Sequence, residues 1–255
     1  MLSIANRNTI DSKRGGLTGL NKIFASYNFT NMWSSENLTV SGTTTTLHDY
    51  ASEHDLSNPS AVNQPSFNSS GGVGSESKPS LTFVTNDILS KSITDYRGSD
   101  SSGVFISVLK VNSGTNIFDI GIWDSTQLAN YVNQTSTISS KYRFLHNSGV
   151  IRVASGTSDV LTGSPNLVTS SACSGSAYYI VINGVSETLA FTSGTNDGAV
   201  WLDSTTGRDS LAIGGRLSNS PAYGNLEWCM GGYMPFVSEA NIIAVQEELK
   251  TYYGI

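Results

Sequence analysis

The sequence is poor in charge and in cysteine. Of 255 residues, only 13% are Asp, Glu, Lys or Arg, about half the share usual in soluble domains. The net charge of −6 leaves no basic stripe for nucleic acid, and no apolar run approaches the roughly 18 residues of a membrane span. The first ten residues also lack the apolar segment of a secretory signal. We therefore expect neither nucleic-acid binding nor membrane insertion.

The sequence also lacks motifs typical of cofactor-binding proteins. Cys173 and Cys229 lie far apart in sequence and neither belongs to a Cys/His cluster, which argues against structural zinc. Nothing marks an oxidising compartment, so we expect two thiols, although a disulfide stays open. The sequence contains no Walker motif, no G-x-G-x-x-G turn, no heptads and no internal repeat. No cofactor is expected.

Small polar residues are abundant instead. The 41 Ser, 24 Thr, 21 Asn and 25 Gly sum to 111 of the 255 residues. Hydrophobic residues still make up 38%, enough for a packed core. Because Ser, Asn and Asp stand almost everywhere, a single one of them carries little information about a site.

Short apolar runs separated by Gly, Ser, Asn and Thr clusters predict many strands. The clearest signal is Asn183-Gly184 between two such runs, which predicts a type I′ hairpin turn with positive φ at both residues. The predicted strands are Ser80–Thr85, Gly103–Val111, Ile117–Trp123, Lys141–His146, Val150–Ser155, Ala177–Ile182, Val185–Thr192, Ala199–Leu202, Ser210–Ile213 and Gly231–Phe236.

One helix is predicted, over about residues 238–253. Ser238 is a favourable N-cap and Gly254 a favourable terminator. Between them Ile242, Val245, Leu249 and Tyr252 form one apolar stripe, which we expect to pack on the edge or end of the strands. Residues 1–24 are polar and are expected to form an N-terminal arm that docks on a neighbouring subunit.

The order of these pieces resembles a concanavalin A-like domain of the laminin G type, found in bacteriophage and bacterial surface proteins. The resemblance covers about residues 25–255. Seven segments, in this order along the chain, resemble the family: the Asp-containing turn Asp49–Asp55, the segment Gln64-Pro65-Ser-Phe67, the strand that leads to Asp87-Ile-Leu89, the Asn183-Gly184 hairpin, Leu211–Arg216, Met230–Phe236 and the closing Leu249–Ile255. It departs from the family at Ala51–Glu53, where a turn glycine is usual, and at Gly232-Tyr233, where an acidic residue is frequent.

The resemblance implies an all-β fold, a two-sheet antiparallel β-sandwich of the jelly-roll type, with the C-terminal helix and the N-terminal arm added. This agrees with the independent strand pattern. Members of the family bind sugars, proteins or lipids, or serve only in assembly, so the fold alone leaves the function open.

Catalytic and metal-binding patterns are weak. The paired carboxylates of a sandwich glycosidase are not found at strand spacing, and His48, His54 and His146 form no recognisable triad, so we expect no enzyme. Calcium is possible through five aspartates in predicted loops, although each more readily caps its own turn. These are Asp49, Asp55, Asp87, Asp95 and Asp100. For carbohydrate, Trp201, Asp203 and Tyr223 are the candidates, as aromatic platforms beside a carboxylate.

Three roles remain. The first is a non-enzymatic phage virion structural or appendage protein that exposes the sandwich for host attachment, located on the virion with other virion proteins or its own subunits as partners. A homo-oligomer is expected in that role. The second is a carbohydrate-binding adhesin, extracellular or on a cell surface, that contacts a host glycan. The third and least favoured is a sandwich-type glycoside hydrolase.

Overall fold

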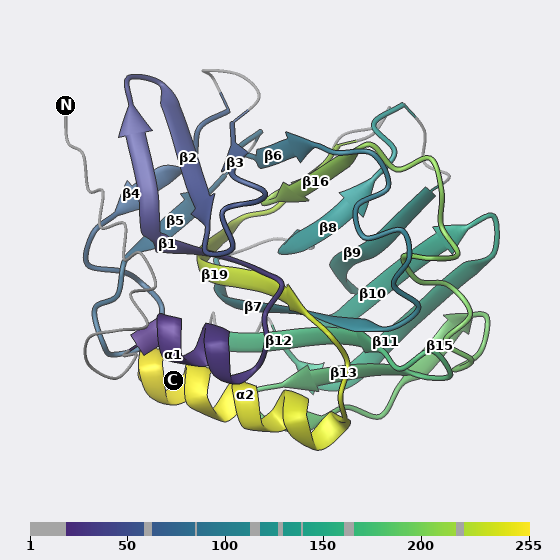
Figure 1. Cartoon of the computed structure of the whole chain (residues 1–255). Coiled ribbons are helices and arrows are strands. Elements are labelled where there is room, and N and C mark those ends of the chain that lie inside the picture. The colour runs from purple at the N-terminus through teal and green to yellow at the C-terminus, as the bar shows by residue number, and fades with distance from the viewer. Residues whose placement is uncertain are drawn as a thin grey trace.

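The computed structural model describes residues 19–58, 63–84, 86–112, 118–126, 130–138, 140–160, 166–217 and 222–255. Nearly all described pairings are antiparallel, and two layers of strands face each other, with two helices lying against one of them (Figure 1). The predicted all-β, two-sheet sandwich with a C-terminal helix is confirmed.

One layer, here called the helix-covered sheet, is centred on β7 and β19. Its strand order is β4 (Ser66–Asn68), β5 (Ser80–Phe83), β19 (Leu226–Met234), β7 (Gly103–Val111), β12 (Asn166–Cys173), β13 (Tyr178–Ile182) and β14 (Val185–Ser186).

The other layer, here called the second sheet, continues from a shared strand. β1 (Asn31–Ser41) pairs through its first residues with β19 and through its last with β2, and so links the layers. From β2 the order is β2 (Thr44–Asp49), β3 (Leu56–Ser57), β6 (Leu89–Ser92), β16 (Ser210–Ile213), β8 (Ile120–Trp123), β9 (Asn130–Ile138), β10 (Lys141–Ser148), β11 (Ile151–Asp159) and β15 (Ala190–Ser193). A small hairpin, β17 (Gly215–Arg216) and β18 (Ala222–Tyr223), follows β16.

Strands of the helix-covered sheet are apolar on both faces because both faces are covered. On β7, Phe105 and Leu109 enter the core between the sheets, whereas Ile106 and Val108 enter a second core beneath the helices. β13 divides in the same way, with Ile180 in the first core and Val181 in the second. This is the two-sided burial that the apolar pattern of residues 178–182 predicts.

The C-terminal helix α2 (Glu239–Tyr253) has the predicted ends. The Ser238 side chain accepts a hydrogen bond from the Asn241 amide, and Gly254 closes the helix in the left-handed conformation at φ 70°. The helix packs across the outer face of the helix-covered sheet, so the predicted edge or end position is wrong. Tyr253 is the fully buried tyrosine, whereas Tyr252 is half-buried and its hydroxyl donates to Glu36.

The Asn183-Gly184 turn has positive φ at both residues, 51° and 82°, as predicted. Gln246 of α2 holds this hairpin, because its Oε1 accepts from the Gly184 amide and its Nε2 donates to the Val181 carbonyl and the Ser170 hydroxyl. Gln246 is itself fully buried, so the helix and the hairpin form one packed unit.

The predicted arm is partly wrong. Residues 1–18 lie outside the described residues, but residues 19–24 belong to helix α1 (Gly19–Ser26), which packs on α2 and buries Leu20 and Ile23. The predicted strand Ala199–Leu202 is also wrong, because these residues lie in a loop that runs into a turn. Cys173 and Cys229 are both free, as expected, and lie in different cores. Neither helix that the structure describes is long and apolar enough to cross a membrane.

Candidate functional site

The second sheet carries a row of neighbouring side chains on its outer face, the face directed away from the sandwich core. Antiparallel register places Ser210, Trp123, Tyr131 and Asn147 side by side on β16, β8, β9 and β10. Their chain neighbours, such as Ile122 on β8, belong to the core between the sheets. Alternation along each strand therefore directs the row outward.

This row forms the floor of the candidate site. The centroid of the Trp123 ring lies 6.0 Å from that of Tyr131 and 6.4 Å from that of Phe118. Trp123 is only 2% exposed and Tyr131 only 9%. With Ile88 and Ala212 they make a third hydrophobic cluster, separate from the two main cores. Buried aromatic rings at this position give a rigid base on which exposed groups can be held.

Five half-buried side chains surround this floor and are called the rim. Leu145, Leu217 and Tyr223 pack against the third cluster. Arg143 follows the outward alternation of β10, and Arg216 lies in the β17–β18 hairpin opposite Ala222. The rim thus combines an aromatic ring, two aliphatic side chains and two guanidinium groups.

The charges of two arginines act on the Tyr131 hydroxyl. Burial raises the pKa of Tyr131, and the hydrogen bond with Asn147 and the charges of Arg216 and Arg143 act in the opposite direction. Burial lowers the pKa of each arginine as well, yet a guanidinium group stays charged at neutral pH. Such an arrangement can pair with a planar anion in two-pronged geometry, and its rings and methyl groups can contact apolar surface.

The three sugar-site candidates predicted from sequence do not come together. Trp201 is 0% exposed, in the core between the sheets against Phe105 and His146, so it cannot act as an exposed platform. Asp203 is exposed in a turn, and its backbone amide donates a hydrogen bond to the Asp100 carbonyl. Only Tyr223 lies at the rim, where it packs against the third cluster.

The five aspartates weighed for calcium each accept hydrogen bonds from protein groups. Asp49 accepts backbone bonds within its own turn, and Asp55 accepts from the Asp49 amide and from His48. Asp87 accepts from Val84, Asp95 from Arg208, and Asp100 from Arg97 and Tyr233. In the part of the chain that the structure describes, no three His, Cys, Asp or Glu residues gather as metal ligands.

The histidines offer no triad where the structure describes them. His146 is fully buried and stacks on Phe144, with ring centroids 4.5 Å apart. Burial lowers its pKa to about 3, so it is neutral at physiological pH and serves packing. His48 lies on β2 and contacts Asp55 and Thr39, with its side chain 31% exposed.

No family model and no curated protein matches the chain. Solved structures do match. Trypanosoma rangeli sialidase in complex with sialic acid aligns with a TM-score of 0.58 and 10% identity, over 87% of this chain and 33% of that chain. The same sialidase in complex with 2,3-difluoro-KDN aligns with a TM-score of 0.58 and 11% identity, over 88% of this chain and 33% of that chain.

A smaller domain also aligns, the CBM40 of Ruminococcus gnavus IT-sialidase bound to α2,3-sialyllactose. Its TM-score is 0.46 and its identity 13%, over 57% of this chain and 82% of that chain. This chain spans about a third of the length of the Trypanosoma sialidase. At 10% identity the likeness to the Trypanosoma sialidase shows the fold alone.

The comparisons correct one expectation. We expected no enzyme, but chains that share this fold include sialidases, which are glycoside hydrolases, so that exclusion was wrong. The virion location, the homo-oligomer and calcium binding stay predictions from the sequence.

Proposed function

We propose that this chain is a carbohydrate-binding module and that the rim and floor of the second sheet recognise an acidic glycan. The observation that carries the proposal is that a buried aromatic floor has half-buried arginines at its border, Arg143 on β10 and Arg216 on the β17–β18 hairpin, whose charges both act on Tyr131. In a chain of net charge −6 with only 14 Lys and Arg, two arginines on one aromatic cluster mark a place for a negative ligand.

The chemistry of sugars fits this surface. A sugar acid presents a carboxylate that a guanidinium group binds through two parallel hydrogen bonds, and its ring presents C–H faces that pack on Tyr223 and Leu145. The T. rangeli sialidase was solved with sialic acid, a carboxylate-bearing sugar, and shares the fold of this chain. Both facts support an acidic sugar as the ligand class.

The first test is a glycan array followed by calorimetry with an acidic hit. Arg143→Gln and Arg216→Gln are each expected to weaken binding by tenfold or more, because a charge-assisted hydrogen bond contributes about 1.5–3 kcal/mol. Lys22→Gln, at an exposed position of helix α1, is the matched control and should leave the dissociation constant unchanged. An array without hits, or arginine variants that bind as the wild type does, would contradict the proposal.

As a second candidate we propose that the module is displayed on a phage particle, supported by the hydroxyl-rich, weakly charged composition and the resemblance to phage surface domains. The predicted docking arm must be cut before Gly19, because Leu20 and Ile23 are buried in the domain itself. Deletion of residues 1–18 is expected to leave the melting temperature unchanged and to reduce incorporation into particles. Normal incorporation would reject the docking arm.

A further inference from the structure

The sequence contains one Asn-Gly pair, Asn183-Gly184, and one Asp-Gly pair, Asp197-Gly198. Such pairs are chemically labile. The backbone nitrogen of a glycine can attack the Cγ atom of the preceding side chain, because glycine has no side chain that hinders the approach. The attack closes a succinimide ring, and water then opens the ring to aspartate or to isoaspartate. Isoaspartate has one extra carbon in the main chain, so a turn that contains it loses its geometry.

The fold requires both glycines. Gly184 has a φ of 82° and Gly198 a φ of 62°, in the left-handed region that strains residues with a side chain. At Gly198 a Cβ atom would also lie 2.6 Å from the Ser176 amide nitrogen. A different residue after Asn183 or Asp197 would therefore disturb the turn, so the fold has to restrain the labile pairs where they stand.

The Asn183 side chain is fixed by strand β12. Its Oδ1 accepts a hydrogen bond from the Val168 amide at 2.7 Å, and its Nδ2 donates to the Asn166 carbonyl at 3.3 Å. The Asn183 amide donates to the Val168 carbonyl at 2.9 Å. Both ends of the side-chain amide are thus held, which fixes the position of Cγ, the atom that the Gly184 nitrogen would attack.

Helix α2 holds the peptide group between Asn183 and Gly184 at both ends. Lys250 Nζ donates to the Asn183 carbonyl at 3.1 Å, and the Gly184 amide donates to Gln246 Oε1 at 2.8 Å. Gln246 and Lys250 are one helical turn apart and therefore share a face of α2. Ring closure needs the reacting atoms within about 3–3.5 Å and in line. The Gly184 nitrogen would have to lose the proton that Gln246 binds, and the planar peptide group would have to turn away from both helix residues.

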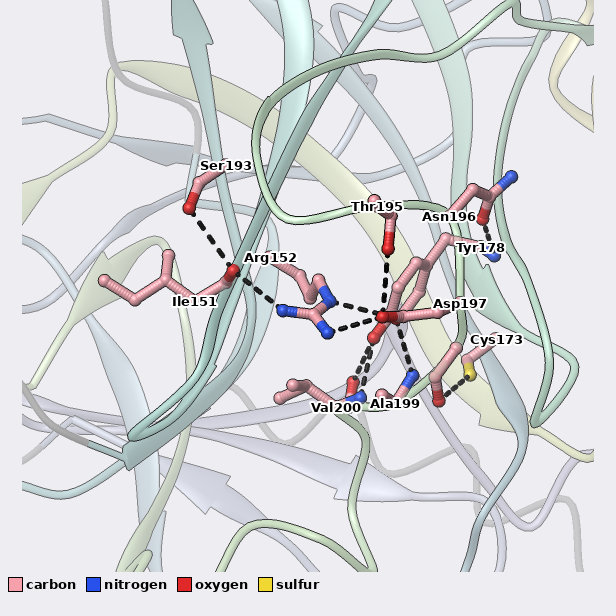
Figure 2. A network of polar contacts seen from close by, with 11 residues as sticks. Ile151, Arg152, Cys173, Tyr178, Ser193, Thr195, Asn196, Asp197, Ala199 and Val200 are labelled. Carbon is pink, nitrogen blue, oxygen red and sulfur yellow. Dashed lines mark hydrogen bonds and ion pairs between the residues drawn. The ribbon is translucent and has the colours of Figure 1, made fainter.

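Asp197 is held by a different set of contacts. Arg152 Nε donates to Asp197 Oδ1 at 2.9 Å, and its Nη2 donates to Oδ2 (Figure 2). The Ala199 amide donates to Oδ1 at 3.0 Å and the Thr195 hydroxyl to Oδ2 at 3.1 Å. The hydrogen bond from Arg152 keeps the pKa of Asp197 well below its usual value. Ring closure on an aspartate needs the protonated carboxyl group, from which water can leave, so the ionised carboxylate is the unreactive form.

We propose that these contacts protect the two pairs from succinimide formation, with Gln246 protecting Asn183 and Arg152 protecting Asp197. At Asn183, the bond between Gly184 N and Asn183 Cγ forms, the Cγ–Nδ2 bond breaks and ammonia leaves. At Asp197, the bond between Gly198 N and Asp197 Cγ forms and water leaves. Water is the only other reactant, because it opens both rings. The proposal is independent of carbohydrate binding and gives α2 a chemical role besides packing.

The test measures both reactions in the full chain. Protein is incubated at mildly alkaline pH for Asn183 and at mildly acidic pH for Asp197, then digested. Deamidation is measured by mass spectrometry and isoaspartate by enzymatic methylation. In the wild type, both sites are expected to react at least about tenfold more slowly than in the guanidinium-unfolded chain, because they must first open locally. Gln246→Leu is expected to accelerate the reaction at Asn183 about tenfold or more and to leave Asp197 unchanged. Arg152→Gln is expected to do the reverse, so each variant is the control for the other site.

Two further variants separate the hydrogen bond from helix stability. Val245→Ala loosens the packing of α2 in the second core but leaves Gln246 in place, and it should react at Asn183 more slowly than Gln246→Leu. Lys250→Met removes only the bond to the Asn183 carbonyl and should accelerate that reaction a few fold. It also tests the site if Gln246→Leu does not fold.

Three outcomes would overturn the proposal. A wild type that reacts as fast as the unfolded chain would show that neither pair is protected. Unchanged rates at Asn183 in Gln246→Leu and Lys250→Met, or at Asp197 in Arg152→Gln, would reject the assigned residues. If Val245→Ala reacted as fast as Gln246→Leu, the stability of α2 would govern the rate and the Gln246 hydrogen bond would not.

Discussion

Replacement of Asp49 by Asn is expected to destabilise the protein by about 3 kcal/mol, because the buried carboxylate accepts five hydrogen bonds. Asp49 is only 2% exposed. Its Oδ1 accepts from the amides of Met32 and Ala51, and its Oδ2 accepts from Asn31 Nδ2 at 2.7 Å and from the amides of Glu53 and His54. An Asn side chain would direct an NH₂ group at two or three of these donors.

The effect should be visible as a lower urea midpoint at pH 7, with the slope of the transition unchanged. Asp55→Asn is the matched control. Its carboxylate also lies in this turn, but its side chain is 45% exposed and can be satisfied by water, so a loss below about 1 kcal/mol is expected. Equal losses of unfolding free energy in the two variants would show that the Asp49 carboxylate stabilises the turn no more than the Asp55 carboxylate does. In the turn that the laminin G resemblance identifies, the Asp49 carboxylate caps the backbone amides of Ala51, Glu53 and His54.

Sequence pattern predicted the architecture where apolar residues alternate and failed where hydroxyls are buried. β7 and β16 have the predicted bounds, because Gly103–Val111 and Ser210–Ile213 are apolar runs ended by small or polar residues. β12 was missed. Its Thr169, Ser170 and Ser171 are almost fully buried and read as loop in the sequence. A partner from another element, Gln246 of α2, satisfies the Ser170 hydroxyl, and no local pattern contains that information.

The candidate site was missed for a related reason. Tyr131, Arg143 and Arg216 are far apart in sequence, and only the pairing of β8, β9 and β10, together with the β17–β18 hairpin, brings them to one face. A β-bulge between β9 and β10 shifts the register between Leu145 and Asn147, which places Asn147 opposite Tyr131. Trp201 attracted attention because tryptophan often forms sugar platforms, but it fills the core, as tryptophan in a sandwich more often does.

The second large effect is expected at Arg208, a fully buried arginine that ties loops together through their carbonyl groups. Its Nε donates to the Thr205 carbonyl at 2.9 Å, its Nη1 to the Tyr96 carbonyl at 3.2 Å and its Nη2 to the Leu202 carbonyl at 2.8 Å. Its backbone amide also donates to Asp95 Oδ1 at 3.1 Å. Burial lowers the pKa of its guanidinium group, yet the group remains charged at neutral pH because an arginine pKa starts so high.

Arg208→Met preserves volume but leaves three buried carbonyl groups without their donor, so we expect a loss of about 3–4 kcal/mol in urea unfolding. Arg208→Lys keeps the charge but cannot reach three acceptors at once with a single ammonium group, and a loss nearly as large is expected. Arg97→Met, at a half-buried ion pair with Asp100 in which Arg97 makes a single hydrogen bond, is the control and should cost clearly less, about 1 kcal/mol. If Arg208→Lys were as stable as the wild type, the charge would matter and the fork geometry would not. If Arg208→Met were neutral, the three hydrogen bonds of the Arg208 side chain would contribute little to the stability of these loops.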